Sequence, residues 1–249
     1  MGRVGIWHGA RAILCAFVLF LPLVWCPSPV RAIEQSATIR VPILAYHNVD
    51  YSGSEFSVTP EQLDEQCRWL IDNGYTPISL WQFWDGAMGS GTLPPNPVML
   101  TNDDGWSSTM TFAEVLGKHG LPATYFINNV SPLTPDQILV LSQRGTVQAH
   151  TVSHAHLAGM DYESQLDEIV NNIAYLEQIT GQPIHFMAWP WGESDQSAVQ
   201  AAAAAGIVGA FGLSGTGAYT PAGNAYYIPR ILMVVSDDLD TFAAKVNWW

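Results

Sequence analysis

Short apolar runs alternate with helical patterns along most of the chain after about residue 40. A short apolar run bounded by turn residues predicts a buried strand, whereas apolar residues that recur every three or four positions predict an amphipathic helix. The first pattern predicts strands at residues 40–47, 75–79, 97–101, 123–128, 146–150, 185–189, 207–212 and 226–234. Helices are expected to fill the intervals between them.

Four of these helices have recognisable boundaries. The clearest is predicted over residues 162–180, where apolar residues recur on one face and a glycine follows. The capping box at residues 59–62, with proline at the first helical position, predicts a helix that ends at Gly74. Further helices are predicted after the Thr-Pro pair at residues 134–135 and over the alanine-rich residues 194–205.

This alternation of strands and helices predicts a parallel sheet, either open or closed into a barrel, within one α/β domain. In both arrangements the functional groups gather at the carboxyl ends of the strands. Several candidate residues follow predicted strands: His47, Asp103, Asp104, His150 and the Trp-Pro-Trp-Gly turn at residues 189–192. Their common position predicts a functional site there, with the loops 51–57 and 86–96 as its rims.

Residues 1–32 have the pattern of a secretory signal peptide. Basic residues precede an apolar stretch over residues 12–25, and residues 30–32 (Val-Arg-Ala) resemble a signal-peptidase site. The stretch is too short to span a bilayer comfortably. We therefore expect a cleaved signal, export to the periplasm or the medium, and a mature domain over residues 33–249 without a membrane span. An uncleaved membrane anchor is the alternative.

Residues 33–249 hold six of the nine basic residues and all 22 acidic ones, so their formal charge is about −16. Such a charge favours solubility, repels nucleic acid and anionic lipid, and attracts a cationic amino sugar. Cys67 is the only cysteine in this part of the chain, so no internal disulfide can form. It shares an apolar helix face with Leu63 and Leu70 and is predicted to be a buried structural thiol. We expect a monomer without nucleic-acid partners.

Two segments carry the residues of a metal site. A strand-like run ends in Asp103 and Asp104, followed by glycine, and a His-Thr-Val-Ser-His segment spans His150 to His154. Together they offer one carboxylate and two imidazole ligands, with a second carboxylate to spare. A divalent metal such as zinc accepts three such ligands and keeps a position open for water in catalytic sites, and nickel and cobalt suit the same set. The plainer alternatives are an ordinary Asp-Gly turn and unrelated surface histidines.

These segments resemble the motifs of the polysaccharide deacetylases, the NodB-homology family also called carbohydrate esterase family four. Residues 101–105 (Thr-Asn-Asp-Asp-Gly) are similar to the family's Thr-Phe-Asp-Asp-Gly motif, and the histidine segment matches its His-Ser/Thr-x-x-His motif. The resemblance implies a distorted (β/α) barrel of the NodB-homology type. It also implies that Asp104, His150 and His154 hold the metal and that Asp103 is the catalytic base.

Within the family, the chain looks most like exported poly-β-1,6-N-acetylglucosamine deacetylases, whose sequences are circularly permuted. In them the histidine that acts as general acid lies near the N-terminus, and Leu-x-x-His47 resembles that segment, so His47 is assigned as the acid. The family's Arg-Pro-Pro-Tyr-Gly motif is here Ala-Trp-Pro-Trp-Gly at residues 188–192, without arginine. The backbone N–H of Trp191 can fill the family's oxyanion role, and Arg230 is a candidate for contact with the region of the base.

The resemblance implies that the chain hydrolyses acetamido groups of an N-acetylglucosamine polymer and releases acetate, with Trp189, Trp106 and Arg230 as candidate substrate contacts. The biofilm exopolysaccharide is the first candidate polymer, and chitin and peptidoglycan are alternatives. A non-catalytic glycan-binding protein with the same fold also stays open, because the motif arginine is missing and Asn102 replaces the usual phenylalanine. A serine hydrolase is disfavoured because no Gly-x-Ser-x-Gly elbow occurs.

Overall fold

The computed structural model describes residues 1–2, 5, 39–213, 215, 218–219 and 224–247. The predicted signal peptide lies outside these residues, apart from three positions at its start. Gln35–Trp249 form one compact unit by their internal contacts. Among the described residues, no helix combines the length and the apolar character needed to cross a membrane.

The central sheet has eight strands, in the order β10-β9-β8-β7-β6-β2-β12 with β5 also paired to β6, and every pairing is parallel. The strands are β2 (Ile43–Tyr46), β5 (Thr76–Pro77), β6 (Pro97–Asn102), β7 (Thr124–Ile127), β8 (Thr146–Ala149), β9 (Phe186–Ala188), β10 (Gly209–Phe211) and β12 (Ile231–Leu232). Each falls within a predicted range, except that β6 extends one residue further. Two short pairs lie apart from this sheet: β1 (Ile39–Arg40) with β11 (Ala218–Tyr219), and β3 (Asn48–Val49) with β4 (Ser57–Val58).

One segment of chain joins the two edges of this sheet. Ile228 bridges to Phe211 of β10, at one end of the strand order, and β12 pairs with β2 near the other end. Residues 228–232 therefore bridge the open side of a curled, half-barrel sheet. This arrangement confirms the predicted fold class, a distorted barrel of parallel strands.

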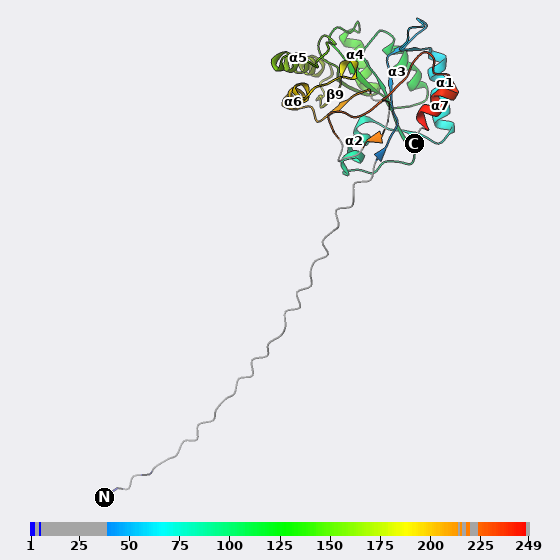
Figure 1. Cartoon of the computed structure of the whole chain (residues 1–249). Coiled ribbons are helices and arrows are strands. Elements are labelled where there is room, and N and C mark those ends of the chain that lie inside the picture. The colour runs from blue at the N-terminus through cyan, green and yellow to red at the C-terminus, as the bar shows by residue number, and fades with distance from the viewer. Residues whose placement is uncertain (3–4, 6–38, 214, 216–217, 220–223, 248–249) are drawn as a thin grey trace. The chain divides into compact units, whose positions relative to one another are not determined.

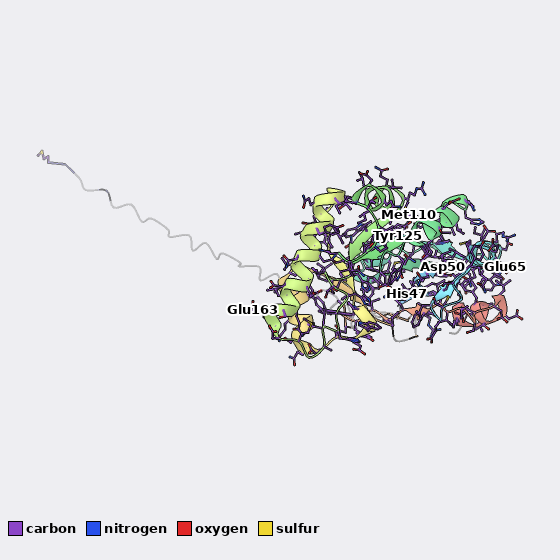
Figure 2. The ribbon with its side chains drawn as sticks, turned by 90° about the horizontal axis from the view of Figure 1, so that it is seen from above. His47, Asp50, Glu65, Met110, Tyr125 and Glu163 are labelled. Atoms are coloured by element: carbon purple, nitrogen blue, oxygen red, sulfur yellow. The ribbon has the colours of Figure 1, made fainter. Side chains whose placement is uncertain are left out.

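Helices surround the curled sheet, most of them on its outer face (Figure 1). They are α1 (Pro60–Asp72), α2 (Leu80–Met88), α3 (Thr109–Lys118), α4 (Pro135–Arg144), α5 (Tyr162–Thr180), α6 (Gln196–Ala204) and α7 (Leu239–Val246). Neighbours pack in the order α7, α1, α3, α4, α5 and α6. Glu163 of α5 and Glu65 of α1 lie on opposite sides of the molecule, with His47 between them (Figure 2).

The four helices with predicted boundaries are confirmed as α1, α4, α5 and α6, and one predicted loop needs correction. The rim predicted at residues 86–96 is helical up to Met88. The reason is a second capping box, in which Ser79 and Gln82 start α2 by bonding reciprocally to each other's backbone N–H groups. α2 then ends at Gly89, whose φ of 73° suits glycine.

Alternate residues of each strand face two separate cores. One face packs beneath the helices, with Leu44, Leu100 and Tyr125 among its residues. The other fills the inside of the curled sheet with a second set: Ile43, Met99, Phe126, Phe186 and Phe211, joined by Leu80 and Phe83 of α2. Because strand residues alternate between the two faces, the position that follows each strand can again face inward, where the sheet opens at its carboxyl end.

Candidate active site

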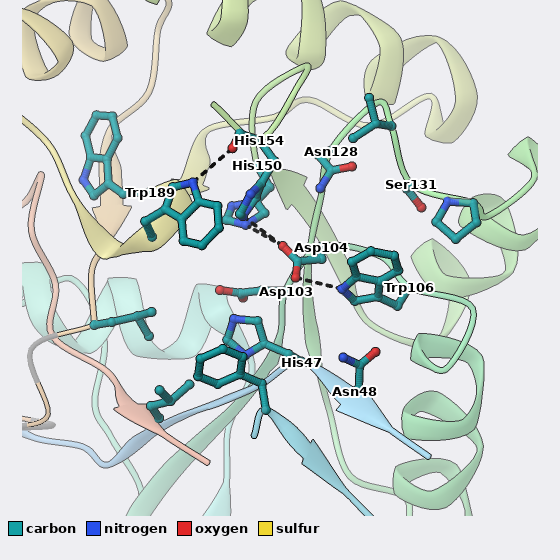
Figure 3. Close-up of a pocket in the computed structure, with 16 residues that line it drawn as sticks. His47, Asn48, Asp103, Asp104, Trp106, Asn128, Ser131, His150, His154 and Trp189 are labelled. Atoms are coloured by element: carbon teal, nitrogen blue, oxygen red, sulfur yellow. Dashed lines mark hydrogen bonds and ion pairs between the residues drawn. The ribbon is translucent and has the colours of Figure 1, made fainter. Parts of the chain in front are cut away.

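A cavity of about 640 Å³ opens at the carboxyl ends of the central strands (Figure 3). The residues that line it include His47, Asp103, Asp104, Trp106, Asn128, His150, His154 and Trp191. Four of them, His47, Asp103, Asn128 and His150, occupy the inward-facing positions that follow β2, β6, β7 and β8. The structure thus brings predicted site residues that are far apart in the sequence, from His47 to Trp191, into one cavity.

Asp104, His150 and His154 converge as the sequence predicts (Figure 3). Asp104 Oδ1 lies 3.2 Å from Nε2 of His150 and 3.1 Å from Nε2 of His154. One ligand atom from each of the three residues lies within 4.8 Å of the others. The second carboxylate oxygen of Asp104 accepts a hydrogen bond of 2.9 Å from the indole N–H of Trp106. This bond leaves Oδ1 facing the two imidazoles.

The chemistry of these three groups fits a divalent cation. Nδ1 of His150 donates to the carbonyl oxygen of Ala188 at 2.8 Å, so the lone pair of the neutral ring is on Nε2. That lone pair faces Asp104 Oδ1, and two acceptors at 3.2 Å need a proton or a cation between them. Burial by itself lowers the pKa of His150, but its hydrogen bond to Asp104 and the nearby carboxylate charges outweigh burial and raise that pKa. A metal could take the place of the proton.

The backbone around this trio adopts conformations that side chains disfavour. Among the described residues, five that are not glycine have positive φ, and four of these, Asp104, Thr151, His154 and Trp191, belong to the site. Such conformations cost about 1–3 kcal/mol each and persist only where the surroundings hold them, most often at functional sites. Their concentration here indicates that the loop geometry serves function rather than stability.

Asp103 forms a buried ion pair with Arg230. Two guanidinium N–H groups donate to its two carboxylate oxygens at 2.7 Å each, and the side chains are 1% and 0% exposed. Burial opposes ionisation of Asp103, but the charge and hydrogen bonds of Arg230 outweigh burial, so the pKa of Asp103 is lowered. Arg230 also donates to Thr101 Oγ1 and to the Gly212 carbonyl and lies over the Phe126 ring.

These contacts correct one part of the sequence analysis and support another. The predicted substrate contact through Arg230 does not hold, because the side chain is fully buried and does not line the cavity. The expected contact with the region of the base is present. Arg230 therefore holds Asp103 in place.

His47 directly follows β2 and lines the cavity. Its Nδ1 is buried without a hydrogen-bond partner among the described residues. Burial is the largest influence on its pKa and lowers it, while the charges of Asp103 and Asp104 act in the opposite direction. An imidazole with a lowered pKa gives up its proton readily. Its place in the cavity with Asp103 and Asp104 is compatible with a proton donor, and the role of general acid stays a prediction.

The tryptophans predicted near the site differ in exposure. Trp106 is 48% and Trp191 55% exposed, and both line the cavity. Trp191 also donates its indole N–H to the carbonyl of His154 at 3.2 Å. Trp189, by contrast, is fully buried in the core, with its indole N–H bonded to the carbonyl of Tyr226. Trp189 also lines the cavity, but little of its ring is accessible, so the predicted substrate contact through Trp189 stays a prediction.

The backbone N–H of Trp191 has the setting of an oxyanion donor. Trp191 lies in a 3-10 turn, Pro190–Gly192, whose first hydrogen bond runs from the N–H of Gly192 to the carbonyl of Trp189. The turn itself does not use the N–H of Trp191, as is general for the first donors of a helix. The role predicted for this group depends on the backbone alone and stays a prediction.

Residues 90–210 match a family model described as polysaccharide deacetylase. The matched segment contains the converging carboxylate and imidazole ligands and the predicted base. The chain belongs to the polysaccharide deacetylase family. This family, carbohydrate esterase family four, is one of hydrolases. His47 and Arg230 lie outside the matched segment, so the case for their roles depends on geometry.

Curated relatives agree with this membership, and a solved structure shares the fold. One relative is YxkH of Bacillus subtilis, whose name describes it as a polysaccharide deacetylase. It is 27% identical over 179 residues, which cover 68% of this chain and 63% of the relative. The chain thus spans less than two thirds of that relative's length. The poly-β-1,6-N-acetyl-D-glucosamine N-deacetylase of Staphylococcus aureus is 25% identical over 215 residues, 78% of this chain and 72% of the relative. The Streptococcus pyogenes deacetylase PplD shares the fold, with a TM-score of 0.78 at 21% identity over 85% of this chain and all of that one.

Asn172 of α5 fixes the backbone at His150, one of the candidate metal ligands. Its Oδ1 accepts a hydrogen bond of 2.8 Å from the backbone N–H of His150, and its Nδ2 donates to the Ile127 carbonyl and to Asn129 Oδ1. The sequence analysis did not identify Asn172. A signal exists, because this polar residue interrupts the apolar stripe of the helix three residues after Ile169. A buried amide on such a stripe needs partners, and here they belong to the site.

Glu168 of α5 holds the loop between His150 and His154 from its outer side. Its carboxylate accepts hydrogen bonds from the backbone N–H and the hydroxyl of Ser153 at 2.8 and 2.7 Å, and its carbonyl accepts one from the N–H of Val152. The loop between the two histidines is therefore anchored on α5 independently of any metal. No local motif predicts this contact, because the partners are 15 residues apart.

Asn172→Ala is expected to weaken zinc binding by about 10- to 100-fold, the usual effect of removing a group that orients a metal ligand. The backbone N–H of His150 would lose its partner, and the ligand would lose its fixed position. Titration calorimetry of zinc into the protein, after a chelator has removed any bound metal, measures the change. Asn171→Ala, at the exposed neighbouring position on the same helix, is the matched control and should bind zinc as the wild type does. Equal losses in both variants would contradict a specific role for Asn172.

Proposed function

We propose that the chain is a metal-dependent N-deacetylase that hydrolyses acetamido groups of poly-β-1,6-N-acetylglucosamine and releases acetate, with zinc as the metal. The observation that carries this proposal is the convergence of Asp104, His150 and His154 beside the buried carboxylate of Asp103, in a cavity of a polysaccharide deacetylase fold. We also propose that the mature domain acts outside the cytoplasm after export, where such a polymer is found.

The cavity residues suit amide hydrolysis. A divalent cation, when bound, would polarise the acetamido carbonyl and acidify a water molecule. Asp103 is kept ionised by Arg230, and each of its oxygens retains a second lone pair with which to accept a proton from the attacking water. The N–H of Trp191 can donate to the developing oxyanion. His47 can then give its proton to the departing amine, so that water and amide become acetate and glucosamine.

Three observations support the choice of polymer. The Staphylococcus aureus relative whose name specifies this polymer aligns over 78% of the chain. His47 enters the cavity from β2, as in the permuted arrangement that the sequence resembles. The charge of about −16 on residues 33–249 also favours a polymer that becomes cationic as acetyl groups are removed.

Acetate release from defined polymers tests the proposal. The purified protein is loaded with zinc, nickel or cobalt, or stripped with a chelator, and incubated with poly-β-1,6-N-acetylglucosamine, chitin oligomers and peptidoglycan. We expect acetate from the first polymer with metal and none after chelation. Acetate from chitin or peptidoglycan alone would support the proposed deacetylation but contradict the proposed polymer substrate. Tight glycan binding without acetate under any metal would instead indicate a non-catalytic glycan-binding protein.

His47→Ala is expected to lower kcat by about 10²- to 10⁴-fold, the usual contribution of a general acid. The loss arises because the amine would depart without a proton donor, while the metal ligands stay intact. Zinc content by atomic absorption should therefore match the wild type. A variant that lost zinc together with activity would show that His47 acts on the metal site instead.

A further inference from the structure

Asn128 follows β7, the strand between the two that carry the metal ligands. The strand order places β7 between β6, which leads to Asp104, and β8, which leads to His150. Asn128 continues the inward alternation of Phe126, lies 4% exposed, and lines the cavity (Figure 3). The family motifs assign no role to this position, although three neighbouring strand ends each contribute a group to the site.

The amide of Asn128 is unused in the free protein. Its Oδ1 is buried without a hydrogen-bond partner among the described residues. The adjacent Asn129 is different, because its Oδ1 accepts a hydrogen bond of 2.6 Å from Asn172. Among the described residues, other side chains also have such buried, unpartnered atoms, but of these only His47 and Asn128 line the cavity. A buried carbonyl oxygen without a partner lowers stability, so its retention in a functional cavity points to a ligand.

We propose that Asn128 binds the acetylated sugar, its amide turning about χ2 so that Oδ1 faces the cavity and accepts a hydrogen bond from a sugar hydroxyl or from the acetamido N–H of the unit at the metal site. The inference rests on the proposed function and adds a specificity residue to it. A neutral amide matches a neutral, donor-rich ligand, whereas a cation would favour the carboxylates nearby. The sugar supplies the donor that the protein lacks, and the neighbouring metal ligands keep their own partners.

The near-isosteric variant Asn128→Leu tests this role against a purely structural one. Removing an unsatisfied buried amide should raise the melting temperature by about 2–4 °C for each kcal/mol relieved. The same change should weaken binding of a β-1,6-linked N-acetylglucosamine oligomer to the chelated protein by about tenfold or more, measured by titration calorimetry. KM for acetate release with zinc should rise to a similar extent, and zinc affinity should stay at the wild-type value.

Thr124→Val is the matched control. Thr124 lies on the same inward face of β7, and its Oγ1 is likewise buried without a partner among the described residues, but it does not line the cavity. This variant should also be stabilised, yet it should bind the oligomer as the wild type does.

Four outcomes would overturn the inference. Equal oligomer affinity in wild type and Asn128→Leu would overturn it while leaving the proposed function intact. A lower melting temperature in Asn128→Leu would mean a structural role, and a loss of zinc affinity would make Asn128 a metal ligand. Absence of oligomer binding by the wild type, together with absence of acetate release, would overturn this inference and the proposed function together.

Discussion

His150→Ala is expected to leave the protein without stoichiometric zinc and without measurable acetate release. The substitution removes one of three ligands, so the loss should exceed the roughly 100-fold that follows when only an orienting group is removed. It also leaves the Ala188 carbonyl without the hydrogen bond that fixes the ring. Zinc retained after dialysis, measured by atomic absorption, and acetate release from the polymer give the two readouts.

His119→Ala is the matched control for this experiment. His119 also faces a carboxylate, with Nε2 2.8 Å from Asp64 Oδ1, but the pair lies outside the cavity. Its removal should change neither zinc content nor acetate release. Full zinc retention by His150→Ala, with the far-ultraviolet circular dichroism of the wild type, would mean that the metal binds elsewhere.

Arg230→Met is expected to destabilise the fold by about 3–5 kcal/mol, the usual effect of removing one partner from a buried ion pair. The carboxylate of Asp103 would stay buried without its counter-charge. For a domain of this size the melting temperature should fall by about 10 °C. Calorimetric unfolding measures this shift, and acetate release should be lost because Asp103 is no longer held in place.

The dependence of stability on pH should change sign in this variant. In the wild type the native pKa of Asp103 is lowered, so its contribution to stability is present above the unfolded pKa of about 3.9 and is lost as pH falls through the native value. Without Arg230, burial dominates and raises that pKa. Stability should then fall as pH rises through the acidic range, which urea unfolding at several pH values can follow.

A double variant separates folding from catalysis. Replacing Asp103 with leucine in the Arg230→Met protein removes both charges, and a buried pair exchanged for apolar side chains often recovers or exceeds the original stability. The double variant should therefore unfold near the wild-type temperature and still release no acetate. Wild-type stability in the single Arg230→Met variant would contradict the energetic role assigned to the pair.

The sequence predicts the metal trio well because its members lie in two short motifs. Each motif follows a buried strand, and parallel strands bring their carboxyl ends to one edge. That rule suffices to place Asp104 beside His150, which is 46 residues away. The eight strand positions are predicted for a similar reason, since each apolar run is short and bounded by polar residues.

The remaining parts of the site depend on contacts that no local pattern contains. The bond between Arg230 and Asp103 joins residues 127 positions apart, and the sequence shows only that an arginine exists late in the chain. The burial of the Trp189 side chain is not predicted, for a different reason. Trp189 follows Ala188, which faces the inner core, so strand alternation turns its ring to the opposite face and into the helix-covered core. Its position at the end of β9 correctly predicts that it lines the cavity, but not that its side chain is buried.

The closure of the sheet by residues 228–232 has a consequence for how the enzyme is made. Arg230 follows both loops of the candidate metal site in the chain, so the guanidinium that pairs with Asp103 is synthesised after them. Truncated products would keep an unneutralised charge in a gap between β10 and β2. We therefore expect a chain cut before Arg230 to lack both the closure of the sheet and the counter-charge of Asp103.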